Sequence, residues 1–398
     1  MKQIIFLGSL LFLLAVCQPN TKKEYHSQSA NSDVPDPGIV MGAYQFDEYL
    51  PALTNTNVAL IVNQTSTVEQ THLVDTLIAL GVNVKKIFAP EHGFRGTADA
   101  GEHVENGIDK KSGTPLISLY GKNKKPTPDM LRDIDVVLFD IQDVGVRFYT
   151  YISTMHYVME ACAENNKKFI VLDRPNPNGH YVDGPVLDLK FQSFVGIHPI
   201  PIVHGLTVGE LAHMINKEGW LNTTKKCELH VIPMKNYTHR TSYSLPIKPS
   251  PNLPNDQSIK LYPTLCLFEG TAISVARGTY FPFQAIGFPN EKFGSFSFTP
   301  VSIDGMSKYP PHQDRECFGL DLRKVEVKNE ISLKYVIDFY NKAPDKTSFF
   351  NNYFSTLVGN DTLKQQIMNG VSEAEIKKSW ESELSSYKAK REKYLLYP

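Results

Sequence analysis

The sequence predicts an α/β fold, with a Rossmann-like parallel-sheet domain followed by a smaller α+β domain. Between residues 57 and 173, short apolar runs alternate with helix-like stretches, a pattern typical of parallel strands joined by right-handed crossovers. About 360 residues follow a polar amino-terminal segment, which is more than one compact core usually contains. A proline-rich stretch at 247–256 interrupts the pattern, so we expect domains over 38–249 and 250–398.

Five apolar runs are the expected strands of the first domain. Near-continuous apolar runs suit strands that are covered on both faces. In this chain the five runs lie at 57–63, 84–89, 116–120, 134–140 and 168–173. Ser66 and Thr67 offer caps for a helix with Leu73, Leu77 and Leu80 on one stripe. A second helix should carry the stripe from Ile152 to Cys162.

The later elements follow from capping signals and apolar periodicity. A capping box at residues 207–210 precedes a helix, and residues 228–234 form a further strand. In the second domain we expect short strands near 295–303 and 317–327, then a helix around Val336 and Tyr340. A second capping box at 372–375 begins the last helix.

The amino terminus has the pattern of an export signal. Its apolar run from Ile4 to Val16 is too short to span a bilayer as a permanent helix. It ends in Leu-Ala-Val-Cys, which resembles a bacterial lipobox, and residues 1–17 are therefore assigned to the signal, with lipidation expected at Cys17; a simple cleaved signal is the alternative. Residues 18–37 are polar and read as a disordered tether. We expect an exported protein of the cell envelope or periplasm, anchored to a membrane by lipid.

Composition and motifs argue against several classes of ligand. With 41 basic and 42 acidic residues, the net charge of −1 gives no electrostatic case for nucleic acid. No G-x-G-x-x-G follows the first strand, and no C-x-x-C is present, so neither a dinucleotide nor a structural zinc site is supported. No cofactor is expected. Cys162, Cys227, Cys266 and Cys317 are irregularly spaced, and we expect buried free thiols.

Polar and ionisable residues follow every strong strand. In open parallel sheets, ligands bind outside the carboxyl ends of the strands. The residues that should therefore gather in one polar basin are Asn63, Glu91, His92, Arg95, Glu102, Asp143, Arg147, Tyr149, Asp173 and Arg174. A glycine-rich loop from the second domain, bearing Glu269 and Arg277, is expected to face the same cleft.

These residue types suit the hydrolysis of a glycosidic bond. That reaction typically uses two carboxyl groups. Glu91 follows a buried strand beside proline and aromatic residues, and burial would favour its protonated form and a role as general acid. The second carboxyl group could be Glu102, Asp143 or Glu269. The arginines at 95, 147, 174 and 277 are candidates to hold an anionic substrate by bidentate hydrogen bonds.

A metal-dependent hydrolase is an alternative. Oxygen and nitrogen ligands lie within thirteen residues, at Glu91, His92, Asp99, Glu102 and His103. Their spacing matches no established ligand pattern such as H-E-x-x-H, and we therefore predict no metal.

Six ordered motifs carry a resemblance to a known family. They are A-P-E-H-G-F-R-G at 89–96, D-I-Q-D-V-G-V-R-F-Y-T-Y at 140–151, L-D-R-P-N-P at 172–177, P-I-V-H-G-L-T at 201–207, S-P-N-L-P at 250–254 and F-E-G-T at 268–271. Together they resemble the exo-acting β-N-acetylmuramidases, a bacterial family of glycoside hydrolases. The resemblance implies release of N-acetylmuramic acid from the non-reducing end of peptidoglycan fragments, during cell-wall turnover.

The resemblance also implies an active site in a cleft between the two domains. The family's glutamate in the P-E-H-G motif falls on Glu91, and the fourth motif places His204 among the substrate-binding candidates. The expected substrates are muropeptides or disaccharides derived from peptidoglycan. Their N-acetylmuramic acid carries a lactyl carboxylate, which would explain the arginines. A peptidoglycan-binding protein without catalytic activity is the second alternative.

Overall fold

The computed structural model describes residues 38–91, 93–94, 106–121 and 123–398. The predicted signal, the tether and Cys17 lie outside these residues, as do His92, Arg95 and Glu102. Within the described part of the chain, no helix is both long and apolar enough to cross a membrane.

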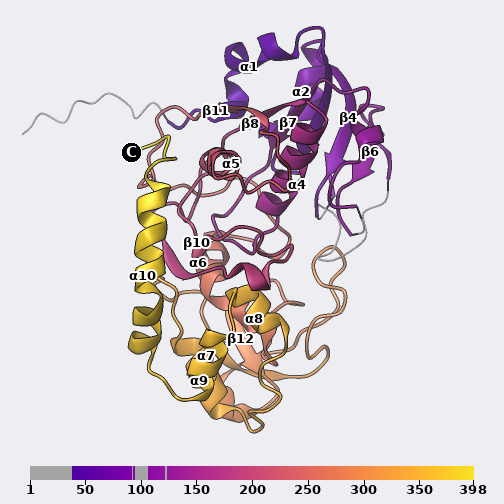
Figure 1. The fold of residues 1–398 in the computed structure, drawn as a ribbon. Helices are drawn as coiled ribbons and strands as arrows, with labels where there is room; N and C mark the ends of the chain where they lie inside the picture. The colour runs from indigo at the N-terminus through magenta and orange to yellow at the C-terminus, as the bar shows by residue number, and fades with distance from the viewer. Residues whose placement is uncertain (1–37, 92, 95–105, 122) are drawn as a thin grey trace, which may run out of the picture. The chain divides into compact units, whose positions relative to one another are not determined.

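A seven-stranded sheet forms the centre of the larger part (Figure 1). Its strands are, in spatial order, β11 (Glu228–Ile232), β8 (Lys168–Leu172), β7 (Val136–Asp140), β1 (Asn57–Val62), β4 (Asn83–Ala89), β6 (Pro115–Ser118) and β5 (Gly107–Ile108). Neighbouring strands are parallel except for the β5–β6 pair at the edge. The chain runs outward from β1 through β4 to β6, then returns to β7 on the other side. This is the doubly wound, Rossmann-like order that the sequence predicted.

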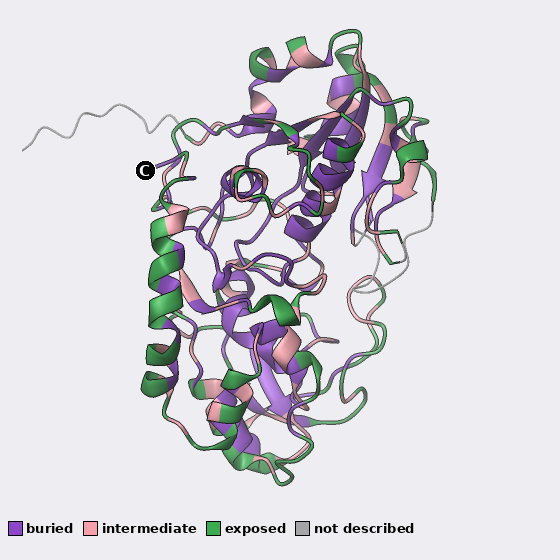
Figure 2. Cartoon of the chain, in the orientation of Figure 1, coloured by how far each residue is buried: buried purple, intermediate pink, exposed green. Residues whose placement is uncertain are grey.

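Helices cover both faces of this sheet because its buried strands are apolar on both sides (Figure 2). Alternate residues of a strand point to opposite faces: Ala59 and Ile61 of β1 belong to one apolar cluster, and Val58 and Leu60 to another. The first cluster includes residues of α4 (Tyr151–Glu164) and α5 (Val208–Lys217). The second includes residues of α1 (Phe46–Leu53) and α2 (Leu73–Ala79).

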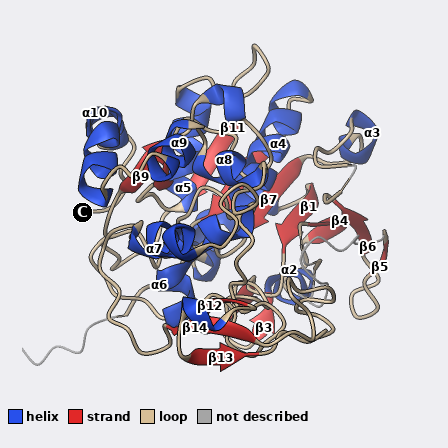
Figure 3. Cartoon of the chain, turned by 90° about the horizontal axis from the view of Figure 1, so that it is seen from below, coloured by secondary structure: helices blue, strands red, loops and turns tan. Residues whose placement is uncertain are grey.

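The smaller part contains an antiparallel sheet in the order β12 (Ala285–Phe288), β14 (Cys317–Asp321), β13 (Phe296–Phe298), which lies apart from β1, β4 and β7 in Figure 3. The helices of this part of the chain are α6 (Asp256–Leu265), α7 (Lys334–Lys342), α8 (Tyr353–Val358), α9 (Thr362–Met368) and α10 (Glu373–Arg391). The remaining short elements are α3 (Pro128–Leu131), the hairpins β2 (Thr67–Val68) with β3 (Thr71–His72) and β9 (Asp183–Val186) with β10 (Pro201–Val203), and 3-10 turns η1 (Gly42–Tyr44), η2 (Leu189–Phe191), η3 (Cys266–Gly270) and η4 (Glu291–Phe293). The α/β fold with a smaller α+β part is therefore confirmed.

One local prediction needs correction. Ser66 and Thr67 do not cap α2; the cap is His72, whose Nδ1 accepts a hydrogen bond from the Val74 amide at 3.2 Å. The reason is that residues 67–68 and 71–72 first pair as a small hairpin. The predicted proline-rich crossing at 247–256 ends where α6 begins, because Asn255 and Ser258 form a capping box there.

The carboxyl terminus returns to the larger part. The hydroxyl group of Tyr397 donates to Asp173 at 2.6 Å, and that of Tyr387 donates to the His204 carbonyl at 2.8 Å. Arg391 donates from Nε to the Gly205 carbonyl at 2.9 Å. Through these contacts α10 and the tail join the sheet, and residues 38–398 form one compact unit. The four cysteines at 162, 227, 266 and 317 are buried free thiols, as expected.

Candidate active site

The site begins between β1 and β7, where the chain reverses its direction of travel across the sheet. At such a switch point the two loops diverge and leave a crevice beyond the strand ends. Asn63 fixes both loops: its Oδ1 accepts hydrogen bonds from the Thr65 amide at 2.9 Å and the Thr65 hydroxyl at 2.6 Å. The Thr65 hydroxyl oxygen in turn accepts from the Gln142 amide at 3.0 Å. Asn63 is fully buried, so its contacts shape the edge of the sheet.

Glu91 stands two residues beyond the end of β4 and is half-buried. The Thr150 hydroxyl, from the loop that precedes α4, donates to Glu91 Oε2 at 2.7 Å. Tyr120, beyond the end of β6, also hydrogen-bonds Glu91, and burial, the Glu91 charge and this bond raise the pKa of Tyr120. The carboxyl group is therefore held by residues from two other strand ends.

Tyr149 lies just before α4 and Tyr151 is its first residue. These two tyrosines connect the surroundings of Glu91 with those of Asp143. The rings of Tyr149 and Tyr151 meet edge to face with centroids 4.9 Å apart, and the Tyr149 hydroxyl donates to the Pro249 carbonyl at 2.7 Å. Burial raises the pKa of Tyr151, and the charges of Glu91 and Asp143 act in the same direction. Tyr151 thus lies within the electrostatic reach of both carboxyl groups.

Asp143 is a buried carboxyl group that forms no ion pair with a lysine or arginine of the described residues. It is 5% exposed, its Oδ2 accepts from the Gly145 amide at 2.6 Å, and its Oδ1 has no hydrogen-bond partner among the described residues. Burial raises the pKa of Asp143 to about 7, because a low-dielectric environment disfavours the charged form. Gly145 must adopt a positive φ of 75° here, and a Cβ on it would lie 2.1 Å from Asn176 Oδ1.

The smaller part contributes an ion pair and a tyrosine. Arg277 Nε lies 2.5 Å from Glu269 Oε1, and the two residues come from the predicted loop. Gly270 brings α8 beside them, since a Cβ at this position would meet the Phe354 Cα at 2.3 Å. Tyr353 begins α8 and is 40% exposed. Burial raises its pKa, and so do the charges of Glu269 and Glu91, which places this phenol near carboxyl groups of both parts.

The structure does not place Arg147 as predicted. This side chain is 1% exposed and donates four hydrogen bonds to backbone carbonyls. Its Nη1 donates to Pro185 and Ile200, and its Nη2 to Leu357 and Val358, at 2.6–3.0 Å. No Nη proton is left for a substrate carboxylate, so the predicted substrate contact is corrected to a structural one.

Arg174 and Asp173 also belong to internal networks. Arg174 forms a bidentate ion pair with the fully buried Asp140, through Nε at 2.5 Å and Nη2 at 2.8 Å. Asp173 accepts from the Thr207 hydroxyl at 2.7 Å and the Gly209 amide at 2.9 Å, which holds the first turn of α5. Arg174 and Asp173 therefore bind other buried groups of the protein at the strand ends. These contacts differ from the predicted contacts with substrate. Arg147, Arg174 and Arg277, the three predicted arginines that the structure describes, therefore each have different partners.

Several predicted residues cannot be placed. His92, Arg95 and Glu102 lie outside the described residues, as do Asp99 and His103 of the alternative metal site. Among the residues that are described, no group of three His, Cys, Asp or Glu side chains could hold a metal ion.

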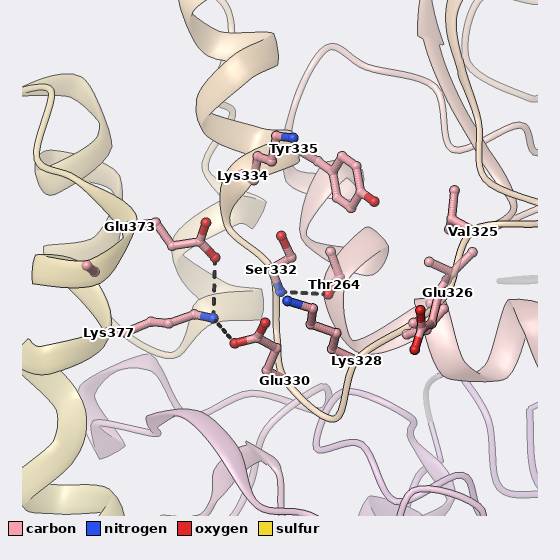
Figure 4. A pocket seen from close by; sticks show the side chains of 13 residues that line it. Thr264, Val325, Glu326, Lys328, Glu330, Ser332, Lys334, Tyr335, Glu373 and Lys377 are labelled. Carbon is pink, nitrogen blue, oxygen red and sulfur yellow. Dashed lines mark hydrogen bonds and ion pairs between the residues drawn. The ribbon is translucent and has the colours of Figure 1, made fainter.

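A well-formed cavity of about 560 Å³ lies elsewhere, between α6, α7 and α10 (Figure 4). Its charged side chains are partly paired: Lys377 Nζ contacts Glu330 at 2.7 Å and Glu373 at 3.3 Å. None of the predicted site residues lines it, and we do not assign the active site there.

Tyr120, Thr150 and Tyr353 were not among the predicted site residues. Thr150 lies inside the quoted D-I-Q-D-V-G-V-R-F-Y-T-Y motif at 140–151 and could have been found by its position before a helix. No local sequence pattern identifies Tyr353 as a residue of the site. It is brought to Glu269 by the packing of α8 on η3, which no short-range pattern reveals.

The fold and this arrangement define a class of protein. A doubly wound sheet that presents carboxyl groups and tyrosines at its carboxyl edge, with a further carboxylate and arginine in the smaller part, is typical of an α/β enzyme that transfers protons on a polar substrate. The chain belongs to the exo-β-N-acetylmuramidase NamZ family: the N-terminal family domain matches residues 58–257, and the C-terminal family domain matches residues 260–397.

A sequence relative and two solved structures are also similar to this chain. The chain is 42% identical over 339 residues to the peptidoglycan β-N-acetylmuramidase NamZ of Bacillus subtilis (strain 168), covering 79% of this chain and 80% of the relative. Two solved structures of DUF1343 family proteins from Bacteroides fragilis NCTC 9343 are also similar. They have TM-scores of 0.84 and 0.79 and identities of 47% and 31%, and each comparison covers 90% of this chain and 99% of the other.

Proposed function

We infer that this protein is an exo-β-N-acetylmuramidase, a glycoside hydrolase that removes N-acetylmuramic acid from the non-reducing end of peptidoglycan fragments. Membership of the NamZ family supports the activity and a peptidoglycan-derived substrate. The observation that carries the assignment to this site is Glu91, the glutamate of the P-E-H-G motif, held at the carboxyl edge of the sheet by Thr150.

In this proposal, Glu91 is the general acid that protonates the glycosidic oxygen. Its partner is Asp143: among the described residues its Oδ1 has no hydrogen-bond partner and no lysine or arginine forms an ion pair with it, which distinguishes it from Glu269. Glu269 is engaged by Arg277 at 2.5 Å, and such an ion pair opposes the protonation changes that an acid or base must undergo. Two carboxyl groups with different environments are the usual requirement for glycoside hydrolysis.

Of the predicted arginines that the structure describes, Arg277 is the one best suited to the lactyl carboxylate of N-acetylmuramic acid. Its Nε is bound by Glu269, while its two terminal nitrogens donate no hydrogen bond to another described residue. It packs over the Phe283 ring with its guanidinium carbon 5.1 Å from the ring centroid, which fixes the plane of the donor groups. Arg147 and Arg174 are occupied in the networks described above.

The activity is tested with two chromogenic substrates. The soluble protein, residues 38–398, is incubated with a β-N-acetylmuramide and with the matching β-N-acetylglucosaminide. Release of the chromophore from the muramide alone supports the proposal. Cleavage of neither substrate, together with tight binding of a muropeptide, would instead identify a peptidoglycan-binding protein.

Glu91→Gln should lower kcat by at least about 100-fold, since a positioned general acid contributes about 10²- to 10⁴-fold. The change removes the transferable proton and keeps the shape of the side chain. The matched control is Glu228→Gln, because the Glu228 side chain is 70% exposed and lies on the edge strand β11. Thermal unfolding should be alike in both variants. If Glu91→Gln retains most of its rate, the assignment of the acid is wrong.

We also propose that the protein is exported and lipid-anchored through Cys17 in the cell envelope, where its substrate occurs. The sequence Leu-Ala-Val-Cys after an apolar run supports this. Metabolic labelling with a radioactive fatty acid should mark the wild-type chain and not Cys17→Ser; equal labelling of both would refute the anchor.

A further inference from the structure

A buried histidine lies against Asp143 in an arrangement that the hydrolytic roles above do not use. His204 Nε2 is 4.0 Å from Asp143 Oδ2, and the two side chains are 1% and 6% exposed. The His204 Nε2 and the Asp143 Oδ1 have no hydrogen-bond partner within the described part of the chain. Buried polar atoms without a partner are uncommon and call for an explanation.

The tautomer of His204 is fixed by its other nitrogen. Nδ1 accepts a hydrogen bond from the Leu206 amide at 3.2 Å, so the ring proton is carried by Nε2, the atom that faces Asp143. Burial lowers the pKa of His204 to about 3, and the charges of Arg391 and Arg147 add to this effect. His204 is therefore a neutral donor of one N–H, and the groups that surround it are Asp143, His198, Arg147 and Arg391.

The backbone on either side of this pair is rigidly held. Gly205 has a φ of +65°, and a Cβ there would lie 2.6 Å from Val182. Its carbonyl accepts both Arg391 Nε and Nη2, and the His204 carbonyl accepts the Tyr387 hydroxyl. On the Asp143 side, the Gly145 backbone packs directly against the Asn176 side chain. The turn that presents His204 is thus fixed by α10, more than 180 residues away in sequence.

We propose that His204 is a positioning residue for the hydrolytic reaction: its Nε2–H orients the carboxyl group of Asp143, so that Oδ1 is directed to the substrate. This inference rests on the proposed function, in which Asp143 is the second carboxyl group. The separation of 4.0 Å exceeds a hydrogen bond. Hydrogen bonds of catalytic groups are commonly long before substrate binds and tighten in the complex.

Two variants test whether the effect of His204 comes from its Nε2–H donor or from the imidazole ring as a whole. His204→Gln places an N–H donor at the position of Nε2 and loses the acceptor at Nδ1. His204→Asn keeps an acceptor near Nδ1 and loses the donor that reaches Asp143. We expect His204→Asn to lower kcat by about 10- to 100-fold with little change in KM, since a misplaced catalytic group has an effect of this size. His204→Gln should retain most of kcat.

The pH dependence of kcat, which reports groups in the enzyme–substrate complex, gives a readout that a purely structural role would not change. Loss of the donor disfavours the charged carboxylate, so the limb of the profile that reports Asp143 should move to higher pH in His204→Asn and not in His204→Gln. Thermal unfolding of both variants shows that they are folded; if His204→Asn does not fold, His204→Gln decides by its kcat alone.

The outcomes are distinguishable. A wild-type rate and an unchanged pH limb in folded His204→Asn would overturn the inference and leave the proposed function intact, as would an equal loss of kcat in both variants. Failure of the wild-type protein to cleave the muramide would overturn the proposed function, and the inference with it.

Discussion

At the scale of single residues, burial decides which candidate side chains can take part in chemistry. Arg147, Arg174 and Arg277 look alike in the sequence, yet Arg147 is enclosed by carbonyls and Arg174 by Asp140, whereas Arg277 keeps two donor nitrogens. Asp143 and Asp173 are both buried carboxyl groups. Asp173 is surrounded by donors, while Asp143 accepts from the Gly145 amide and its Oδ1 has no partner among the described residues.

The raised pKa of Asp143, about 7, makes a prediction for stability. The ordinary value of 3.8 applies to the unfolded chain, so the folded state binds the proton more tightly. The stability that this gives is complete below pH 3.8 and is lost as the pH rises through 7. A tenfold change in proton affinity corresponds to about 1.4 kcal/mol, and the loss approaches about 4 kcal/mol at most.

Asp143→Asn removes this titration. We expect its free energy of unfolding, relative to wild type, to improve between pH 4 and pH 8. Urea denaturation at these two pH values measures the change. A difference between variant and wild type that is the same at both values would show that Asp143 titrates normally in the folded protein.

At the scale of elements, close approaches between backbone segments place the site. The parallel strands, α4, α5 and α10 follow their apolar periods and caps, and the sequence predicts them. The contact between η3 and α8 depends on Gly270, where no Cβ can be accommodated against the Phe354 backbone. This one contact sets Glu269 beside Tyr353, and periodicity does not report it.

Gly270→Ala should therefore destabilise the protein by about 1–3 kcal/mol, because the obstructing atoms belong to backbone and cannot rotate away. It should also lower kcat/KM, since Glu269 and Tyr353 are displaced together. The control is Gly107→Ala, at an edge strand with open space around its Cβ position. Chemical denaturation and muramide hydrolysis measure both effects; equal stability of the two variants would contradict the prediction.

At the scale of the whole molecule, distant segments are joined by a few buried polar contacts. Arg147 follows β7 and binds carbonyls of residues 357 and 358 at the end of α8, and the carboxyl-terminal Tyr397 reaches Asp173 at the end of β8. The apolar core is likewise continuous from the large sheet to the small part. Unfolding of residues 38–398 should consequently be cooperative across both parts.

Arg147→Met tests whether these contacts make the larger and smaller parts unfold together. It leaves four buried carbonyl groups without their donor, and unsatisfied buried groups cost about 1–3 kcal/mol each. We expect a loss of at least about 3 kcal/mol and a separation of the single unfolding transition into two. The matched control is Arg132→Met, whose side chain is 77% exposed and should matter by less than about 1 kcal/mol. A single transition at the wild-type midpoint would contradict this view.

The sequence by itself determined the order and type of the main elements, the two-part α/β class and the Glu91 motif. These depend on local apolar periods, caps and strand ends, which act over a few residues. Only the tertiary structure decided that Arg147, Arg174 and Asp173 serve internal networks and that Tyr353 joins the site. It also showed that His204 faces Asp143. The partners of a buried polar group depend on which chain segments meet in space, and those segments lie 34 to 224 residues apart.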